Sequence, residues 1–323
     1  MAPTATAERI FLRVLAADRV IAFVRLGRPL FLAGGFILYG LGAAIAAFLG
    51  YAIDGVVYGH GQIAITATQL MTHYCNDYFD LEADRANTTP TRWSGGSRVL
   101  PGGELPPWTA LAAAVVLGAI ALAAAVTLTA RAECGPLTLP LVAVAGVLSW
   151  EYSAPPLRLH SRGLGELTVA IVVSGLVPII SFYLQAGRIE ALPVLAIVPL
   201  CCFQLGMLLA IEFPDAAGDA AVGKRTLVVR LGPRAAAWLH VGVLLCGYAM
   251  LPLLAAAGLP AEAAAAVGVT SPLALWLWHA HARRRAWCRA ERWEGLAFVS
   301  VALLVSAAAA ELAAFVLLAR RGG

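Results

Sequence analysis

The sequence predicts an all-α, polytopic membrane protein, because its composition, its apolar runs and the placement of its charges all favour this class. Of the 323 residues, 60% are apolar and 13% are charged, and the mean hydropathy is +0.80. Soluble globular domains have about 45–50% apolar and about 25% charged residues. Disordered chains combine low hydrophobicity with high net charge. The composition therefore excludes both of these classes.

Nine apolar runs are candidates for membrane-spanning helices, since a helix needs roughly 20 apolar residues to cross a bilayer. In chain order they cover residues 29–50, 56–75, 107–130, 136–153, 164–187, 191–213, 236–258, 261–280 and 295–319. The second run is interrupted by His60 and Gln62, and the eighth is short and rich in alanine. We expect residues 1–323 to form a single transmembrane domain of about nine helices.

The segment before the first run, residues 1–28, has a different pattern. Between Glu8 and Arg28, apolar side chains alternate with arginines. This alternation is typical of an amphipathic helix that lies along the membrane surface. We therefore expect residues 1–28 to form an interfacial segment.

The basic residues predict the orientation of the nine spans. If the spans alternate in direction, the N-terminus shares one side of the membrane with loops 76–106, 154–163, 214–235 and 281–294. This side carries 19 of the 23 Lys and Arg residues. Basic loops stay in the cytoplasm, so we expect a protein of the plasma (inner) membrane whose long loops face the cytoplasm. The net charge of +4 and the lack of a basic, aromatic patch argue against a nucleic-acid partner.

Two of these cytoplasmic loops, 76–106 and 214–235, begin with clusters of aspartate. The first cluster is Asp77, Asp80 and Asp84, with Asn76 beside Asp80, and the second is Asp215 and Asp219. Spacings of three and four residues place each cluster on one face of a helix. Like charges so close repel one another, and a bound cation relieves the repulsion. Carboxylate oxygens suit Mg²⁺, which typically binds one or two carboxylates together with substrate phosphates.

The two clusters follow the second and the sixth span, four spans apart. This separation preserves both the side of the membrane and the direction of the chain. It predicts two parallel four-helix pseudo-repeats, each of which contributes one cluster to a central cavity.

Cationic residues follow both clusters. Arg98 comes after the glycine pair 95–96, and Lys224 and Arg225 come after the second cluster. A glycine turn can point backbone N–H groups at an anion, and Lys and Arg bind phosphate oxygens. A plain turn and a membrane-anchoring charge are the simpler interpretations of each feature alone. Together with the aspartates, they indicate a substrate with a diphosphate head and an apolar tail in the lipid bilayer.

These motifs resemble a known family. Residues 76–84 match the pattern NDxxDxxxD of the UbiA family of intramembrane prenyltransferases, and Asp215-xxx-Asp219 with the Gly-Lys-Arg-Thr-Leu that follows resembles its second motif. Segments 152–159 and 162–166 are similar to the loop after its fourth span. The resemblance covers roughly residues 20 to 315 and is strongest to the branch that prenylates dihydroxynaphthoate for menaquinone. Ile211 and Gly218 depart from that branch, which often has Asn and a polar residue there.

The resemblance implies Mg²⁺-dependent transfer of a prenyl group from a prenyl diphosphate to a small aromatic acceptor such as dihydroxynaphthoate. It implies that the metal is held by Asp77, Asp80, Asp84, Asp215 and Asp219, with Asn76 as a polar helper. It also implies that the diphosphate is bound by Arg28, Arg98, Lys224 and Arg225. Tyr152 is a candidate to stabilise the allylic cation through its ring face. His73, one turn before Asp77, is either a contact to the acceptor or an ordinary interfacial histidine.

Two other functions stay open at this point. A terpene cyclase of the same family ionises the same diphosphate and needs no acceptor, so the motifs do not separate it from a transferase. An ion-coupled transporter also uses intramembrane acids, but its coupling sites usually lie near the bilayer midplane. Here the acids lie at the ends of the predicted spans, beside Lys and Arg, which favours the enzyme.

Overall fold

The structure, a computed structural model, describes residues 17–131 and 134–322, and every regular element in these two ranges is helical. Of the predicted interfacial segment, residues 1–16 lie outside the described residues. Residues 17–26 are helical and expose apolar side chains such as Val20 and Val24 beside Arg19 and Arg25. The interfacial position of residues 1–28 stays a prediction.

Helices occupy all nine predicted ranges within the described chain. They are α2 (Pro29–Phe48), α3 (Gly55–Phe79), α5 (Pro107–Thr129), α6 (Thr138–Ser153), α7 (Gly165–Val169) with the π-helical η3 (Ala170–Leu176) and α8 (Val177–Ala186), α9 (Ala191–Glu212), α12 (Pro233–Ala256), α13 (Ala261–Gly268) with α14 (Ser271–Ala282), and α15 (Trp293–Gly322). Three of them, α2, α5 and α12, begin at a proline, which fits the first turn because it lacks an N–H.

Seven helices of the described chain are long and apolar enough to cross a membrane by length and composition. The two other predicted spans are α6, which has 16 residues, and α3, whose polar residues lower its hydropathy. The predicted eighth span consists of two helices, α13 and α14. Helix α14 begins at Ser271, with Pro272 in its first turn, where proline is tolerated but cannot continue a preceding helix. The all-helical membrane fold is confirmed, whereas the count of nine spans stays a prediction.

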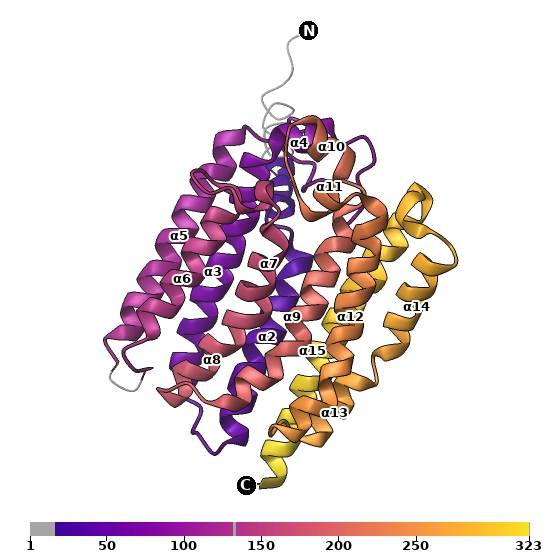
Figure 1. Cartoon of the computed structure of the whole chain (residues 1–323). Coiled ribbons are helices and arrows are strands. Elements are labelled where there is room, and N and C mark those ends of the chain that lie inside the picture. The colour runs from indigo at the N-terminus through magenta and orange to yellow at the C-terminus, as the bar shows by residue number, and fades with distance from the viewer. Residues whose placement is uncertain (1–16, 132–133, 323) are drawn as a thin grey trace.

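The helices form two halves that meet along α2 (Figure 1). In the first half, α3 packs against α2, α5 and α6, and in the second half α9 packs against η3 and α12. Helix α2 contacts α8 of the second half and α15. This arrangement encloses a central space that is lined by residues of both halves.

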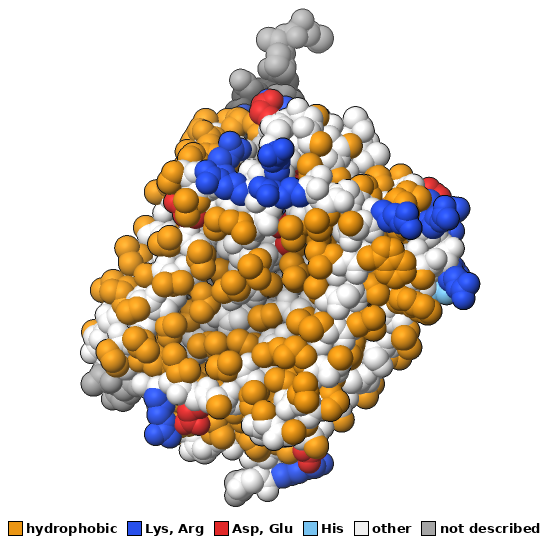
Figure 2. All heavy atoms as spheres, viewed as in Figure 1, with side chains coloured by type: hydrophobic (Ala, Val, Ile, Leu, Met, Phe, Trp, Pro, Cys, Tyr) orange, Lys and Arg blue, Asp and Glu red, His pale blue; other side chains and the backbone are white. Residues whose placement is uncertain are grey.

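One end of the bundle, here called the motif end, carries the short helices α4 (Leu81–Ala86), α10 (Ala216–Ala221) and α11 (Leu227–Leu231), which lie together at the top of Figure 1. Below them the surface is a broad apolar band, with the visible Lys and Arg side chains confined to the two ends (Figure 2). Exposed apolar side chains such as Val116 of α5 and Leu253 of α12 belong to it. Such a band is suited to lipid and not to water, so the chain is an integral membrane protein.

Candidate active site

Two connected cavities lie between the halves at the motif end. The polar pocket is lined by acidic and basic side chains, among them Asp80, Asp84, Asp215, Asp219 and Lys224. The apolar cavity, of about 410 Å³, extends from it between the spans. Six residues line both spaces and form their junction: Arg28, Asn76, Trp93, Tyr152, Leu208 and Ile211. A ligand with a charged head and an apolar body fits this shape.

The first aspartate cluster is divided between two environments. Helix α3 ends at Phe79 and α4 begins at Leu81, but the N–H of Asp84 still donates to the carbonyl oxygen of Asp80 at 2.8 Å. Asp80 and Asp84 therefore stay one turn apart, and both line the polar pocket. Asp77 is 1% exposed, forms an ion pair with Arg28 and accepts a hydrogen bond from the Ser97 hydroxyl. It does not line the polar pocket in this structure.

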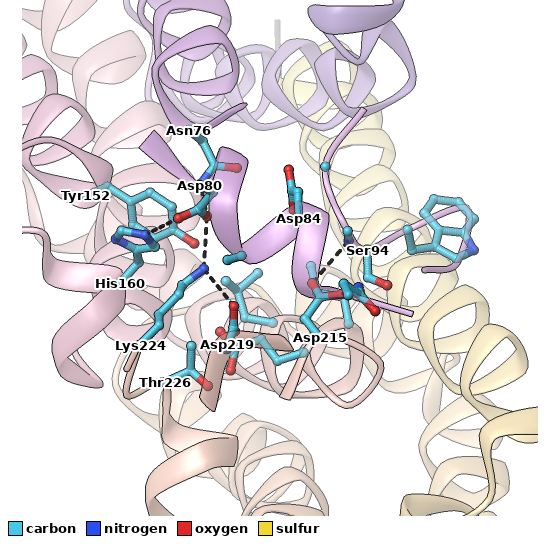
Figure 3. Close-up of a pocket in the computed structure, with 18 of the residues that line it drawn as sticks. Asn76, Asp80, Asp84, Ser94, Tyr152, His160, Asp215, Asp219, Lys224 and Thr226 are labelled. Carbon is cyan, nitrogen blue, oxygen red and sulfur yellow. Dashed lines mark hydrogen bonds and ion pairs between the residues drawn. The ribbon is translucent and has the colours of Figure 1, made fainter. Parts of the chain in front are cut away.

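Asp80 is the most heavily paired carboxylate of the site (Figure 3). Its Oδ2 accepts hydrogen bonds from Asn76 Nδ2 at 2.7 Å and from Lys224 Nζ at 2.9 Å. His160 Nε2 lies 2.5 Å from its Oδ1. Burial opposes ionisation of Asp80, but the charges of Lys224 and His160 outweigh it and lower its pKa. Asp80 is therefore ionised at neutral pH.

Lys224 joins the two aspartate clusters. Its Nζ lies 2.9 Å from Asp80 of the first half and 3.3 Å from Asp219 of the second half. Burial would lower the pKa of Lys224, but these two carboxylates raise it, so the ammonium stays charged. Lys224 thus lies between one carboxylate of each aspartate cluster, whereas the family resemblance implies a contact to the diphosphate and not to the aspartates.

Asp215 and Asp84 are much less well compensated. Asp215 accepts hydrogen bonds from Asn87 Nδ2 at 2.7 Å and from the Gly95 N–H at 3.2 Å, and burial together with Asp219 raises its pKa to about 7. Burial, with neighbouring carboxylates, raises the pKa of Asp84 to about 8. Burial also raises the pKa of Asp219. Protonation of these groups relieves the repulsion when no cation is near.

The donor set suits a hard cation. Asp84 Oδ2 is buried without a hydrogen-bond partner, and it faces the same pocket as the second cluster. Within residues 17–131 and 134–322, no three carboxylate, histidine or cysteine side chains converge as a ready metal centre. The carboxylates surround the pocket without meeting at one point. Metal ions bound partly by phosphate and water oxygens fit such an arrangement.

The four predicted phosphate-binding cations divide into two groups. Arg28 and Lys224 line the polar pocket, and Arg28 also donates to Asn76 Oδ1 at 3.2 Å. Arg98 donates to the backbone oxygen of Asp84, and Arg225 is exposed, so neither lines the pocket. Of the four cations predicted to bind phosphate, Arg28 and Lys224 are therefore the two that the structure places at the polar pocket.

The glycine pair shapes the pocket wall. Gly95 and Gly96 have φ values of 75° and 71°, a region that favours glycine. A Cβ atom at Gly96 would lie 2.0 Å from Asp84 Oδ2. The loop can lie against both aspartate clusters only because these positions carry no side chain.

Several site residues were not predicted from the sequence. His160 is 2% exposed and contacts Asp80, and Asn87 donates a hydrogen bond to Asp215. Both side chains line the polar pocket. His160 lies in loop 154–163, on the same predicted side as the aspartates, and that position was the available signal. Tyr152, which was predicted, lies at the junction of the two cavities, with its ring 5.3 Å from that of His160.

Comparisons with known proteins agree with the motifs. The sequence profile of the UbiA prenyltransferase family matches residues 36–302. The chain is 24% identical over 212 residues to 1,4-dihydroxy-2-naphthoate octaprenyltransferase of Bacillus subtilis, which covers 66% of each chain. It is 26% identical over 211 residues to the chloroplastic chlorophyll synthase of Oryza sativa, covering 62% of this chain and 52% of that one. The matches thus span about two thirds and about half of these relatives.

Solved structures share the fold. The structure of a UbiA homolog from Archaeoglobus fulgidus bound to DMAPP and Mg²⁺ superposes with a TM-score of 0.58 at 16% identity. The match covers 90% of this chain and 98% of that chain. The arrangement of helices is therefore that of a known family of membrane proteins.

Proposed function

The chain belongs to the UbiA prenyltransferase family, and from this premise we propose that it transfers a prenyl group from a prenyl diphosphate to a small aromatic acceptor. The observation that carries the proposal is the junction between the two cavities. A polar pocket that collects the aspartates and Lys224 opens directly into an apolar cavity of about 410 Å³. The first space suits a diphosphate and the second an isoprenoid tail.

Mg²⁺ fits the polar pocket, and Asp80, Asp84, Asp215 and Asp219 are the residues that would hold it. The Archaeoglobus relative, which was solved with DMAPP and Mg²⁺, supports this assignment. When bound, the metal neutralises charge on the diphosphate as the allylic C–O bond breaks. The motif also assigns Asp77 to the metal, and Asp77 would be available to it if Arg28, its present ion-pair partner, bound the diphosphate instead.

The remaining predicted residues act on the two ends of the donor. Lys224 and Arg28 line the pocket and stabilise the departing diphosphate, with Asn76 holding Asp80 and Arg28 in place. Arg98 and Arg225 contribute only if their loops move toward the bound substrate. Tyr152 lies at the junction, where its ring would stabilise the positive charge of the allylic carbon.

The aromatic acceptor is inferred from a relative, and the cellular location is inferred from the distribution of Lys and Arg. The Bacillus relative acts on dihydroxynaphthoate, so we propose an acceptor of this kind, with a role in quinone or related lipid biosynthesis. The 19 of 23 Lys and Arg residues on one predicted side favour a plasma-membrane enzyme whose motif end faces the cytoplasm.

The test is incubation of the purified protein with Mg²⁺, a panel of prenyl diphosphates and hydroxylated aromatic acids, followed by mass spectrometry. The expected product is a prenylated aromatic compound, formed together with diphosphate. A cyclic hydrocarbon formed without acceptor indicates a terpene cyclase instead. Absence of Mg²⁺-dependent diphosphate release, with ion uptake into vesicles, indicates a transporter.

A further inference from the structure

One wall of the apolar cavity is more polar than an isoprenoid tail requires. Five polar side chains of α3 line it: Thr68, Gln69, Thr72, His73 and Asn76. Spacings of three to five residues place them along one face of the helix. The lining from α7, η3 and α9 is more apolar: it includes Val169, Val172 and Leu208, and its polar side chains are Thr168 and Gln204. The contrast indicates that a second, partly polar ligand lies against α3.

The geometry of His73 fixes its tautomer. Its Nδ1 lies 2.7 Å from the backbone oxygen of Gly27, 46 residues away. A carbonyl oxygen only accepts hydrogen bonds, so Nδ1 carries the proton and neutral His73 has its lone pair at Nε2. No residue in the described ranges hydrogen-bonds Nε2. His73 therefore offers the cavity one fixed hydrogen-bond acceptor.

A chain of aromatic side chains begins at His73 and follows the lining of the cavity. The ring of Phe31 lies edge-on to His73, with centroids 6.2 Å apart, and edge-on to Trp93 at 5.9 Å. Phe298 follows at 6.2 Å from Trp93. All four residues line the apolar cavity. Such a group of rings favours a flat aromatic ligand, because edge and face contacts between rings are attractive.

This place also adjoins the expected reacting carbon. Asn76 lies three residues after His73 on α3. Both Asn76 and Trp93 line the apolar cavity and the polar pocket. An aromatic ring that packs against Phe31 and Trp93 on the cavity side therefore lies at the junction where the first carbon of the prenyl tail leaves the diphosphate.

We propose that His73 is a catalytic residue that orients the acceptor and takes the proton of its ring hydroxyl at Nε2, an inference that rests on the proposed function. The ring carbon bonds to the first prenyl carbon as the C–O bond to diphosphate breaks and its electron pair leaves with the diphosphate. The hydroxyl proton passes to Nε2, which leaves a ring ketone. The prenylated carbon then loses its hydrogen as a proton to water, and His73 returns its proton to the oxygen.

A merely structural role for His73 makes a different prediction. The bond from Nδ1 to Gly27 lies beside Arg28, which we place at the diphosphate. If this bond alone matters, loss of His73 weakens binding of the prenyl diphosphate and leaves the choice of acceptor unchanged. The two roles are therefore separable by substrate.

Two substitutions separate the roles of the two imidazole nitrogens of His73. The amide nitrogen of His73→Asn replaces Nδ1, so it keeps the Gly27 bond and removes Nε2, whereas His73→Gln places an amide near Nε2 and gives up the Gly27 bond. His60→Asn is the control, since His60 is an exposed histidine of the same helix whose Nδ1 bonds Val56. Each protein is assayed with Mg²⁺, a prenyl diphosphate, hydroxylated aromatic acids and their methyl ethers.

We expect His73→Asn to lower kcat/KM for the hydroxylated acceptor by about 100-fold, the usual size of a general-base contribution. The KM for the prenyl diphosphate stays unchanged, and the preference of the wild type for hydroxyl over methyl ether disappears. His73→Gln retains part of that preference. An unchanged preference in His73→Asn overturns the inference and leaves the proposed function intact. A wild type that makes no prenylated aromatic product overturns both.

Discussion

At the scale of the residue, Lys224 shows how the site manages its own charge. Its ammonium lies between Asp80 and Asp219, which come from opposite halves of the chain. It thus supplies positive charge in a pocket lined by five acidic side chains, Asp80, Asp84, Glu212, Asp215 and Asp219. Asp84 and Asp215, farther from Lys224, rely on protonation instead, as their raised pKa values show.

These two carboxyls predict how stability depends on pH. Their pKa values of about 8 and about 7 exceed those of unfolded Asp, about 4, so the folded chain holds protons that the unfolded chain has released. Without Mg²⁺, stability is therefore expected to fall as the pH rises from about 5 to about 9. Thermal unfolding in detergent across this range measures it.

The double variant Asp84→Asn with Asp215→Asn serves as the control, and it should make the pH dependence of stability smaller than in the wild type. In the wild type, Mg²⁺ should raise the melting temperature more at about pH 9 than at about pH 6, because protons compete with the metal. A wild type that becomes more stable toward high pH without metal contradicts the assignment of the two raised pKa values.

Gly96 gives a second prediction at this scale. In Gly96→Ala, the new Cβ would lie 2.0 Å from Asp84 Oδ2, which is a steric clash. The left-handed backbone conformation costs about a further 1–2 kcal/mol for a residue with a Cβ. We expect turnover to fall by more than about tenfold, because the loop or Asp84 must move. Gly103→Ala is matched, since Gly103 has a φ of 71° with nothing within 4 Å. Equal turnover of the two variants would refute a role for this close contact.

At the scale of the element, the long apolar runs predicted the helices well, and the loops much less well. Periodicity and apolar length placed α2, α9 and α15 close to their observed bounds. The break between α13 and α14 was missed, because the apolar run continues through it. The positions of loops depend on how the helices pack against one another, which apolar run length alone does not reveal. The helical spacing of Asp77 likewise did not reveal that Arg28 and Ser97 hold it outside the polar pocket.

The same limit explains the predicted and missed site residues. Asp80, Asp84, Asp215 and Asp219 are spaced by helical turns, so one sequence is enough to group them. His160 reaches Asp80 across 80 residues of chain, and no spacing rule connects them. Gly218, a departure from the expected motif, has a structural reason: a Cβ there would lie 3.0 Å from the Asn87 backbone, where α10 packs against α4.

At the scale of the whole molecule, the apolar cavity sets the length of the donor. It extends along α2 from Arg28 to Leu38 and along α15 from Phe298 to Ala308, about 15 Å at 1.5 Å per helical residue. Ala308 is 2% exposed and lies at the deep end. Ala308→Phe shortens this space and should shift the preference toward shorter prenyl diphosphates.

We expect the ratio of kcat/KM for long over short donors to fall at least about tenfold, the lower end of what one apolar group in a pocket contributes. Competition between donors of two lengths, read by mass spectrometry, gives this ratio directly. Ala313→Phe, at an exposed position of the same helix, is the control and should leave it unchanged. If Ala308→Phe also leaves it unchanged, the tail does not occupy this cavity.

The central claim is that aspartates from both halves hold one diphosphate site. It is tested most directly by measuring diphosphate release from a prenyl diphosphate, with acceptor, with and without Mg²⁺. Wild type is compared with Asp80→Ala, Asp215→Ala and Glu82→Ala, the last an exposed acid of the first motif. We predict Mg²⁺-dependent release by wild type and Glu82→Ala, and none by Asp80→Ala or Asp215→Ala, although both still purify from the membrane. Release at the wild-type rate by either aspartate variant contradicts the claim.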